Sequence, residues 1–177
     1  MSEVSFQKPP LIVVDTNALF QSMQNSRRYF IHKYLESNEA GIDQWEDKWA
    51  PARLFWMLDF QEVLLATSPH IIEEVERLLR RHLGKRQRIG KEDHFKSLRN
   101  KLKRAKLVTP PHTISICRDP DDDRIIECAL AAAAKDIVTE DEDLLSIGSY
   151  GSIKILNIVE FVRRRDTELG RGWKLSI

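Results

Sequence analysis

The sequence predicts an α/β protein, a three-layer α/β/α sandwich with a central parallel sheet of four or five strands. Short apolar runs recur along the chain, and segments with the periodicity of an amphipathic helix separate most of them. The chain has 177 residues, of which 42% are hydrophobic and 31% charged, which is the composition of one globular domain with a sizeable core. We therefore expect a single domain in which helices cover both faces of the sheet.

The apolar runs are the predicted strands. Leu11–Val14 is the first, and its continuous, partly β-branched character suits a strand buried on both faces of a parallel sheet. Asp15 stands where this strand ends. Further strands are predicted at residues 63–66, 113–116, 137–139 and 153–156.

Ser68 and Pro69 open the clearest helix, because serine can cap free amide groups and proline is tolerated at the first helical position. This helix is predicted to run to about Leu83. Glu74 falls at the edge of its apolar arc, whereas Glu73 points to the opposite face. Of these two acids, only Glu74 is expected to reach a partly buried pocket.

Three more helices follow the later strands. An alanine-rich helix is predicted from Asp122 or Asp123 through Lys135, a short helix from about residues 141–143, and a last helix over residues 157–165. Alanine allows the first of these to lie close against the sheet.

The remaining features of the chain exclude several classes of protein. We expect one domain over residues 1–177, with an insertion around residues 36–52, and no repeat or linker. Charge is balanced, with 28 basic and 27 acidic residues, and no segment approaches the roughly 20 apolar residues of a membrane span. A cytoplasmic protein without a membrane partner is expected. Cys117 and Cys128 match neither a zinc pattern nor a disulfide framework, so we expect two buried thiols.

Acidic residues follow three of the predicted strands. Asp15 follows the first, residues 119–123 follow the run at 113–116, and Asp141 follows the run at 137–139. The carboxyl ends of parallel strands meet at one edge of a sheet, where open α/β folds bind ligands. Asp15 is the most informative acid, because a carboxylate directly after four apolar residues is costly to bury without a function.

Each of the other acids also has a structural explanation. Asp122, Asp123, Asp141 and Asp143 suit helix caps or first turns, and Glu74 suits a solvated helix face. Their joint placement after successive strands nevertheless favours a site. Converging carboxylates require protonation or a cation, and hard oxygen ligands favour Mg²⁺ or Mn²⁺.

A calcium-binding EF-hand is excluded. Asp119, Asp121 and Asp123 resemble the opening of its loop, but Arg124 replaces the glycine at position six and Leu130 the glutamate at position twelve.

Basic residues concentrate between positions 77 and 106, a segment that contains 13 lysines and arginines but only two acidic residues. Such a patch attracts phosphate backbone, although basic runs also form ordinary solvated helix faces. Substrate binding is favoured here because an acidic site adjoins the patch. The candidate nucleic-acid contacts are Arg77, Arg81, Lys85, Arg86 and Arg88.

Five short motifs in this order resemble the PIN-domain family, and specifically its bacterial and archaeal toxins of toxin–antitoxin pairs. They lie at residues 14–17 (Val-Asp-Thr-Asn), 68–75 (Ser-Pro-His-Ile-Ile-Glu-Glu-Val), 118–123 (Arg-Asp-Pro-Asp-Asp-Asp), 138–145 and 153–161. The resemblance implies a parallel sheet flanked by helices and cleavage of RNA through acids that hold Mg²⁺ or Mn²⁺.

The resemblance also assigns roles to residues. The catalytic and metal-holding acids it implies are Asp15, Glu74, Asp123 and Asp141, with Asp119 and Asp143 as additional metal ligands. Asp123 is preferred over Asp121 and Asp122 because it lies sixteen positions before Thr139, which suits the family pattern. Thr16, Asn17 and Thr139 are expected to orient carboxylates or a metal-bound water.

The function expected from these observations is a metal-dependent endoribonuclease that hydrolyses RNA phosphodiester bonds with a metal-activated water. The family implies a toxin role, an antitoxin protein as partner and a homodimer. Two alternatives stay open: a non-catalytic RNA-binding or scaffold protein, and a metal-dependent phosphatase. The number of metal ions, one or two, is also open.

Overall fold

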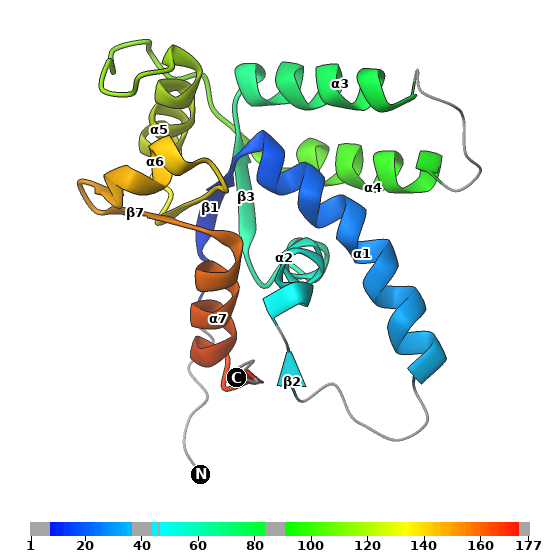
Figure 1. The fold of residues 1–177 in the computed structure, drawn as a ribbon. Coiled ribbons are helices and arrows are strands. Elements are labelled where there is room, and N and C mark those ends of the chain that lie inside the picture. Colours follow the sequence, from blue (N-terminus) through cyan, green and yellow to red (C-terminus); the bar gives the residue numbers. More distant parts are fainter. Residues whose placement is uncertain (1–7, 37–43, 46, 84–90, 174–177) are drawn as a thin grey trace.

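A six-stranded sheet forms the centre of the protein in the computed structural model, which describes residues 8–36, 44–45, 47–83 and 91–173 (Figure 1). In spatial order its strands are β4 (Lys106–Leu107), β3 (Leu64–Thr67), β1 (Leu11–Val14), β5 (Asp136–Val138), β7 (Ile153–Leu156) and β6 (Ser149–Tyr150). All neighbours pair in parallel except β6, which is antiparallel to β7. The predicted α/β class is confirmed, and the two-residue edge strands β4 and β6 raise the strand number above four or five.

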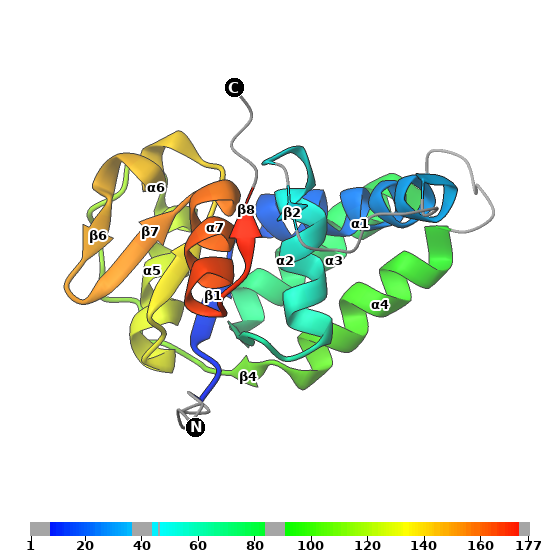
Figure 2. The ribbon, with the colours of Figure 1, turned by 90° about the horizontal axis from the view of Figure 1, so that it is seen from below.

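Helices cover both faces of this sheet. The chain first moves from β1 outward to β3 and β4, then returns to β5 and continues to β7. Because parallel crossovers are right-handed, this reversal places the intervening helices on opposite faces. One layer contains α1 (Thr16–Glu36), α2 (Ala50–Asp59), α3 (Pro69–Leu83) and α4 (Lys91–Arg104), with α7 (Ile158–Glu168) packed on α2. The other contains α5 (Pro120–Ala132) and α6 (Glu142–Ile147) (Figures 1 and 2).

The centre of the sheet is fully buried, as the continuous apolar run predicts. Ile12, Val13 and Val14 are 0% exposed. The amide of Asp15 donates to the carbonyl of Val138 at 2.9 Å, and α1 begins at the next residue. Asp15 is therefore the single residue between the central strand and α1, at the carboxyl edge of the sheet.

The predicted strand at residues 113–116 is absent, and the segment has no regular secondary structure. Its amides donate to two carboxylates on α5 instead of to a strand. Thr113 and Ile114 donate to Glu127 Oε1 at 2.6 and 2.9 Å, and Ile116 donates to Asp123 Oδ1 at 3.1 Å. These two acids lie four residues apart on one helix. Their carboxylates accept the backbone hydrogen bonds that a neighbouring strand would accept if this segment were part of the sheet.

The alanine-rich helix α5 begins earlier than predicted. Asp119 is its N-cap and accepts from the amide of Asp121 at 2.9 Å, with Pro120 at the first helical position. The helix ends before Ala133, which has φ 54° in the left-handed region. The predicted start at Asp122 or Asp123 is therefore two or three residues too late, and the predicted end at Lys135 is three residues too late.

Other predicted helices are confirmed, with small shifts of their ends. Asn157 caps α7 in a reciprocal capping box with Glu160, and Asp141 caps α6. Within residues 36–52 the structure describes β2 (Gln44–Trp45), η1 (Asp47–Trp49) and the start of α2, while 37–43 and 46 lie outside the described residues. The strand β2 pairs in parallel with β8 (Gly172–Trp173) in a second, two-stranded sheet. That this segment is an insertion stays a prediction.

Among the described helices, none combines the length and apolar character needed to cross a bilayer.

Candidate metal centre

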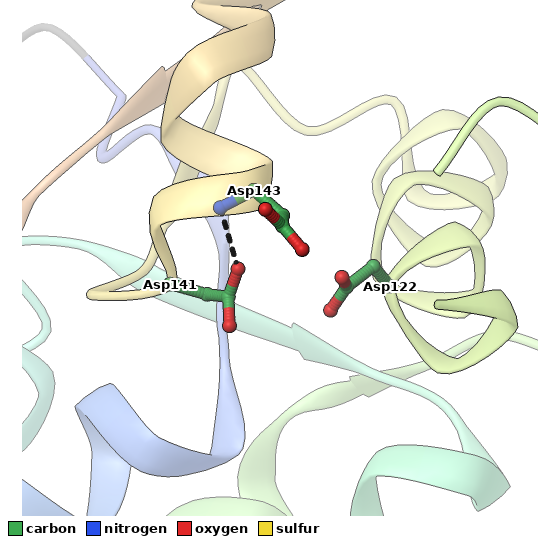
Figure 3. Close-up of side chains that lie close together, drawn as sticks. All are labelled: Asp122, Asp141 and Asp143. Carbon is green, nitrogen blue, oxygen red and sulfur yellow. Dashed lines mark hydrogen bonds between the residues drawn. The ribbon is translucent and has the colours of Figure 1, made fainter. Parts of the chain in front are cut away.

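Three aspartates from two helices meet beside the carboxyl edge of the sheet. Asp122 lies in the first turn of α5, Asp141 caps α6, and Asp143 lies in the first turn of α6. One carboxylate oxygen from each lies within 4.8 Å of the others. Figure 3 shows the three side chains, with Asp122 facing Asp141 and Asp143 across the space between α5 and α6.

Backbone and hydroxyl groups fix the orientation of Asp141. Its Oδ1 accepts from the amides of Asp143 at 2.8 Å and Leu144 at 3.3 Å. Its own amide donates to Thr139 Oγ1 at 3.0 Å. Because only Oδ1 carries the helix-capping bonds, Asp141 can cap α6 and still present Oδ2 to a ligand.

Two more acids lie next to this cluster. Thr139 Oγ1 donates to Asp15 Oδ2 at 3.1 Å, and Thr16 Oγ1 donates to Glu74 Oε2 at 2.7 Å. Glu74 is half-buried, whereas Glu73 is exposed, as the helical periodicity predicts. We call the set of Asp15, Glu74, Asp122, Asp141 and Asp143 the acidic site.

The charges of the acidic site act on one another. Burial raises the pKa of Asp15 to about 6, and the charges of Glu74 and Asp141 add to this, against hydrogen bonds from Thr139 and the Thr16 backbone. Burial also raises the pKa of Asp122 to about 6, together with the charges of Asp141 and of other nearby aspartates, including Asp15. Both carboxylates therefore ionise at a cost that a bound cation would remove.

The donors of the acidic site fit a hard divalent cation. Asp122, Asp141 and Asp143 offer carboxylate oxygens only, which is the ligand type of Mg²⁺ and Mn²⁺. Cys117 is half-buried beside α5, but burial and the neighbouring charge of Asp123 raise the pKa of its thiol to about 12. A neutral thiol is a poor ligand, so the oxygen donors define the site.

The structure places Asp122, and not Asp123, in the acidic site. Asp123 is 3% exposed, and its Oδ1 accepts from the amides of Ile116 and Cys117 at 3.1 and 3.0 Å. Burial raises the pKa of Asp123, but these backbone hydrogen bonds outweigh burial and hold it below its usual value. Asp123 Oδ1 therefore binds the backbone before α5, and Asp122 is the neighbouring acid that lies in the three-aspartate cluster. The sequence assignment of Asp123 as a metal ligand stays a prediction.

The other predicted residues are distributed as follows. Asp143, expected as an additional ligand, lies in the three-aspartate cluster. Asp119 is exposed and caps α5, and its charge helps to raise the pKa of Asp122; its role as a ligand stays a prediction. Thr16 and Thr139 orient carboxylates as expected. Asn17 is exposed in the first turn of α1.

Within the described residues, two basic side chains of the predicted patch are hydrogen-bonded to acids. Arg99 binds Glu76 with two hydrogen bonds of 2.7 and 2.8 Å, and Lys101 is buried against Asp59, with its Nζ 3.6 Å from the Phe55 ring centroid. Arg77 and Arg81 are exposed on α3. Lys85, Arg86 and Arg88 lie outside the described residues.

Sequence reasoning missed Arg118 at the acidic site. Its Nη2 donates to Asp143 Oδ2 at 2.6 Å. Arg77 has a longer contact with Glu74, 3.7 Å between Nη2 and Oε1. The only sequence signal for Arg118 is its position directly before the acidic run at 119–123.

The chain is similar to known proteins in sequence and in structure. A family model described as a PIN domain matches residues 11–143, a range that contains every acid of the acidic site. The uncharacterised protein MJ1680 of Methanocaldococcus jannaschii is 30% identical over 115 residues, which cover 61% of this chain and 70% of that protein. The crystal structure of PAE2754 from Pyrobaculum aerophilum matches 94% of this chain and 99% of that one, with 17% identity and a TM-score of 0.48. PIN domains are generally metal-dependent nucleases, and because the family model covers well over half of the sequence, this chain belongs to the PIN-domain family.

Proposed function

We propose that this protein is a metal-dependent endoribonuclease that hydrolyses RNA phosphodiester bonds. The observation that carries the proposal is the meeting of Asp122, Asp141 and Asp143 oxygens within 4.8 Å of one another. Membership of the PIN-domain family supports nuclease chemistry. The exposed Arg77 and Arg81 support a polymeric, negatively charged substrate over a small phosphate ester.

In this proposal, Asp122, Asp141 and Asp143 hold the cation, with Asp15 beside them. A bound divalent cation supplies a lowered water pKa and stabilises charge on the phosphate. The protein contributes fixed geometry: the Thr139 hydroxyl orients Asp15, and the Thr16 hydroxyl binds Oε2 of Glu74. The other oxygen of Glu74, Oε1, takes no part in this bond and lies 3.7 Å from Arg77 Nη2, and Glu74 would accept a proton from the attacking water.

A cleavage assay with matched variants tests the proposal. The full chain is incubated with labelled single-stranded and hairpin RNA in Mn²⁺, Mg²⁺ or excess chelator. We expect cleavage with metal and none with chelator, and a loss of about 100-fold or more in Asp122→Asn and Asp141→Asn. The control is Asp121→Asn, an exposed acid in the same helical turn that is outside the three-aspartate cluster.

Two outcomes would overturn the proposal. Cleavage that persists in chelator or in Asp141→Asn would exclude the metal mechanism. RNA binding by wild type without cleavage in any metal would favour the RNA-binding or scaffold alternative, and hydrolysis of small phosphate esters alone would favour a phosphatase.

We further propose that the protein acts as the toxin of a toxin–antitoxin pair, as a homodimer whose acidic site an antitoxin segment covers. This proposal rests on the resemblance of the five sequence motifs to such toxins. Induced expression should arrest growth for wild type and not for Asp141→Asn, and light scattering should give the mass of two chains. Unaffected growth at full expression would remove its support.

A further inference from the structure

Arg118 binds an acid that the candidate metal centre also uses. Its side chain is 86% exposed, yet its Nη2 donates to Asp143 Oδ2 at 2.6 Å. The same Asp143 brings a carboxylate oxygen within 4.8 Å of oxygens of Asp122 and Asp141 (Figure 3). A guanidinium and a divalent cation would therefore neutralise the same carboxylate.

This contact is easily broken. Exposed ion pairs contribute little to stability, because water screens the attraction and a long side chain loses freedom when it is held in one place. The Asp143 side chain is itself 41% exposed, so water can replace the guanidinium there. A cation held by Asp143 would both neutralise it and repel the positive charge of Arg118.

The released side chain stays close to the reaction. Asp123 fixes the Cys117 amide, the backbone group next to Arg118, with a hydrogen bond of 3.0 Å. On the other side, Asp119 is fixed as the N-cap of α5. The backbone of Arg118 is thus anchored on both sides, and its exposed side chain, once released from Asp143, would lie within reach of a phosphate held by a cation at Asp143. A planar guanidinium suits a phosphate because it can donate two parallel hydrogen bonds.

We propose that Arg118 changes partner during the reaction: it neutralises Asp143 in the metal-free protein, and metal binding releases it to bind a phosphate of the RNA substrate. This inference rests on the proposed nuclease function. It adds to that function a substrate-binding residue and a direct competition between Arg118 and the metal.

The change of partner predicts effects of opposite sign in Arg118→Ala. Metal binding should become about 2- to 5-fold tighter, because a competing cation is removed. RNA binding in the presence of metal should become about 5-fold weaker. The slope of log affinity against log salt concentration should fall by the amount expected for the loss of about one phosphate contact. Arg118→Lys keeps the charge but not the planar fork, so it should recover part of the RNA affinity.

The experiment uses the full chain and two binding measurements. Mn²⁺ affinity is measured by calorimetry without RNA, and RNA affinity by fluorescence anisotropy in Ca²⁺, with a gel to confirm that the RNA is intact. The control is Arg163→Ala, because Arg163 is likewise paired with an aspartate, Asp47 of η1, through two hydrogen bonds of 2.8 and 2.6 Å. Neither affinity should change in the control.

The outcomes separate this inference from the proposed function. If Arg118→Ala weakens both affinities, the residue only maintains the fold of the site, and the inference is wrong. Unchanged Mn²⁺ and RNA affinities in Arg118→Ala, with wild type cleaving RNA, would also refute it and leave the nuclease function standing. If wild type cleaves no RNA, the nuclease function fails, whereas the competition for Asp143 is still measured by Mn²⁺ affinity.

Discussion

Asp15→Asn should stabilise the metal-free protein at neutral pH. Asp15 is 7% exposed, and burial with neighbouring negative charge raises its pKa from 3.8 to about 6. At pH 7.5 the carboxylate is ionised in the folded state against this cost. An asparagine has nearly the same shape, carries no charge, and can still accept the hydrogen bond from Thr139.

The size of the effect follows from the shift in pKa. Each pKa unit corresponds to 1.36 kcal/mol, so a rise from 3.8 to about 6 costs the folded state about 3 kcal/mol at pH 7.5. Because the pKa of Asp15 is higher in the folded state, this cost is absent below about pH 4, grows as pH rises towards 6, and is constant above it. We expect Asp15→Asn to recover about 1–3 kcal/mol at pH 7.5, or roughly 5 °C in Tm.

The assay is urea unfolding of wild type and Asp15→Asn in excess chelator, at pH 4, 5, 6 and 7.5. The difference in free energy of unfolding should be near zero at pH 4 and should grow with pH up to about 6. Glu73→Gln serves as the control, because it removes an exposed carboxylate from the outer face of α3 and should change stability by less than about 0.5 kcal/mol.

One result would refute the reasoning directly. If Asp15→Asn is less stable than wild type at pH 7.5 in chelator, or if the difference does not depend on pH, Asp15 is stabilised as an anion by contacts other than a cation. The acidic site would then be a structural network.

Three further predictions concern the remaining carboxylates. Asp123→Ala leaves two amides without their acceptor and should cost about 2–4 kcal/mol in urea unfolding, while Asp122→Ala in chelator should cost nothing; equal losses would contradict the distinction between the two. Glu127→Gln should have the opposite pH dependence to Asp15→Asn, because hydrogen bonds outweigh burial and hold the pKa of Glu127 at about 2. The contribution of the Glu127 carboxylate to stability is therefore present above about pH 4.5 and is lost as pH falls through 2. Unfolding measurements should show that Glu127→Gln is less stable than wild type by about 2 kcal/mol at pH 7 and equally stable near pH 2. Mn²⁺ at about 100 times its Kd should stabilise wild type by about 2.7 kcal/mol and Asp141→Asn by much less in thermal unfolding, and an equal gain in both would place the metal elsewhere.

Sequence reasoning succeeded where one local pattern decides a position. Four apolar residues define β1 and leave Asp15 at its end, and the helical period of α3 separates Glu74 from Glu73. Asp141 is identified in the same way by the strand before it.

It failed where contacts distant in sequence decide. Asp122 and Asp123 are adjacent on a helix, and their side chains differ by about 100° in direction. The residue at which α5 starts and the packing of α5 on the sheet therefore determine which of the two lies near Asp141 and Asp143. Polar and apolar residues alternate at positions 113–116, as is typical of a strand, but the amides of this segment donate hydrogen bonds to carboxylates of α5. The pairing of Arg118 with Asp143 likewise joins residues 25 positions apart and has no local pattern.

The hydrogen bonds that Asp123 accepts from the backbone before α5 affect how activity data from this protein would be interpreted. Asp123 fixes the Cys117 amide, and through it the position from which Arg118 extends. Under the proposed nuclease function, substituting Asp123 should therefore lower activity through the position of Arg118. An activity screen alone would class Asp123 with the metal-holding acids, whereas metal affinity measured on the folded variant would separate them. Asp123, which the family pattern favours over Asp121 and Asp122, would then act by holding the backbone next to Arg118.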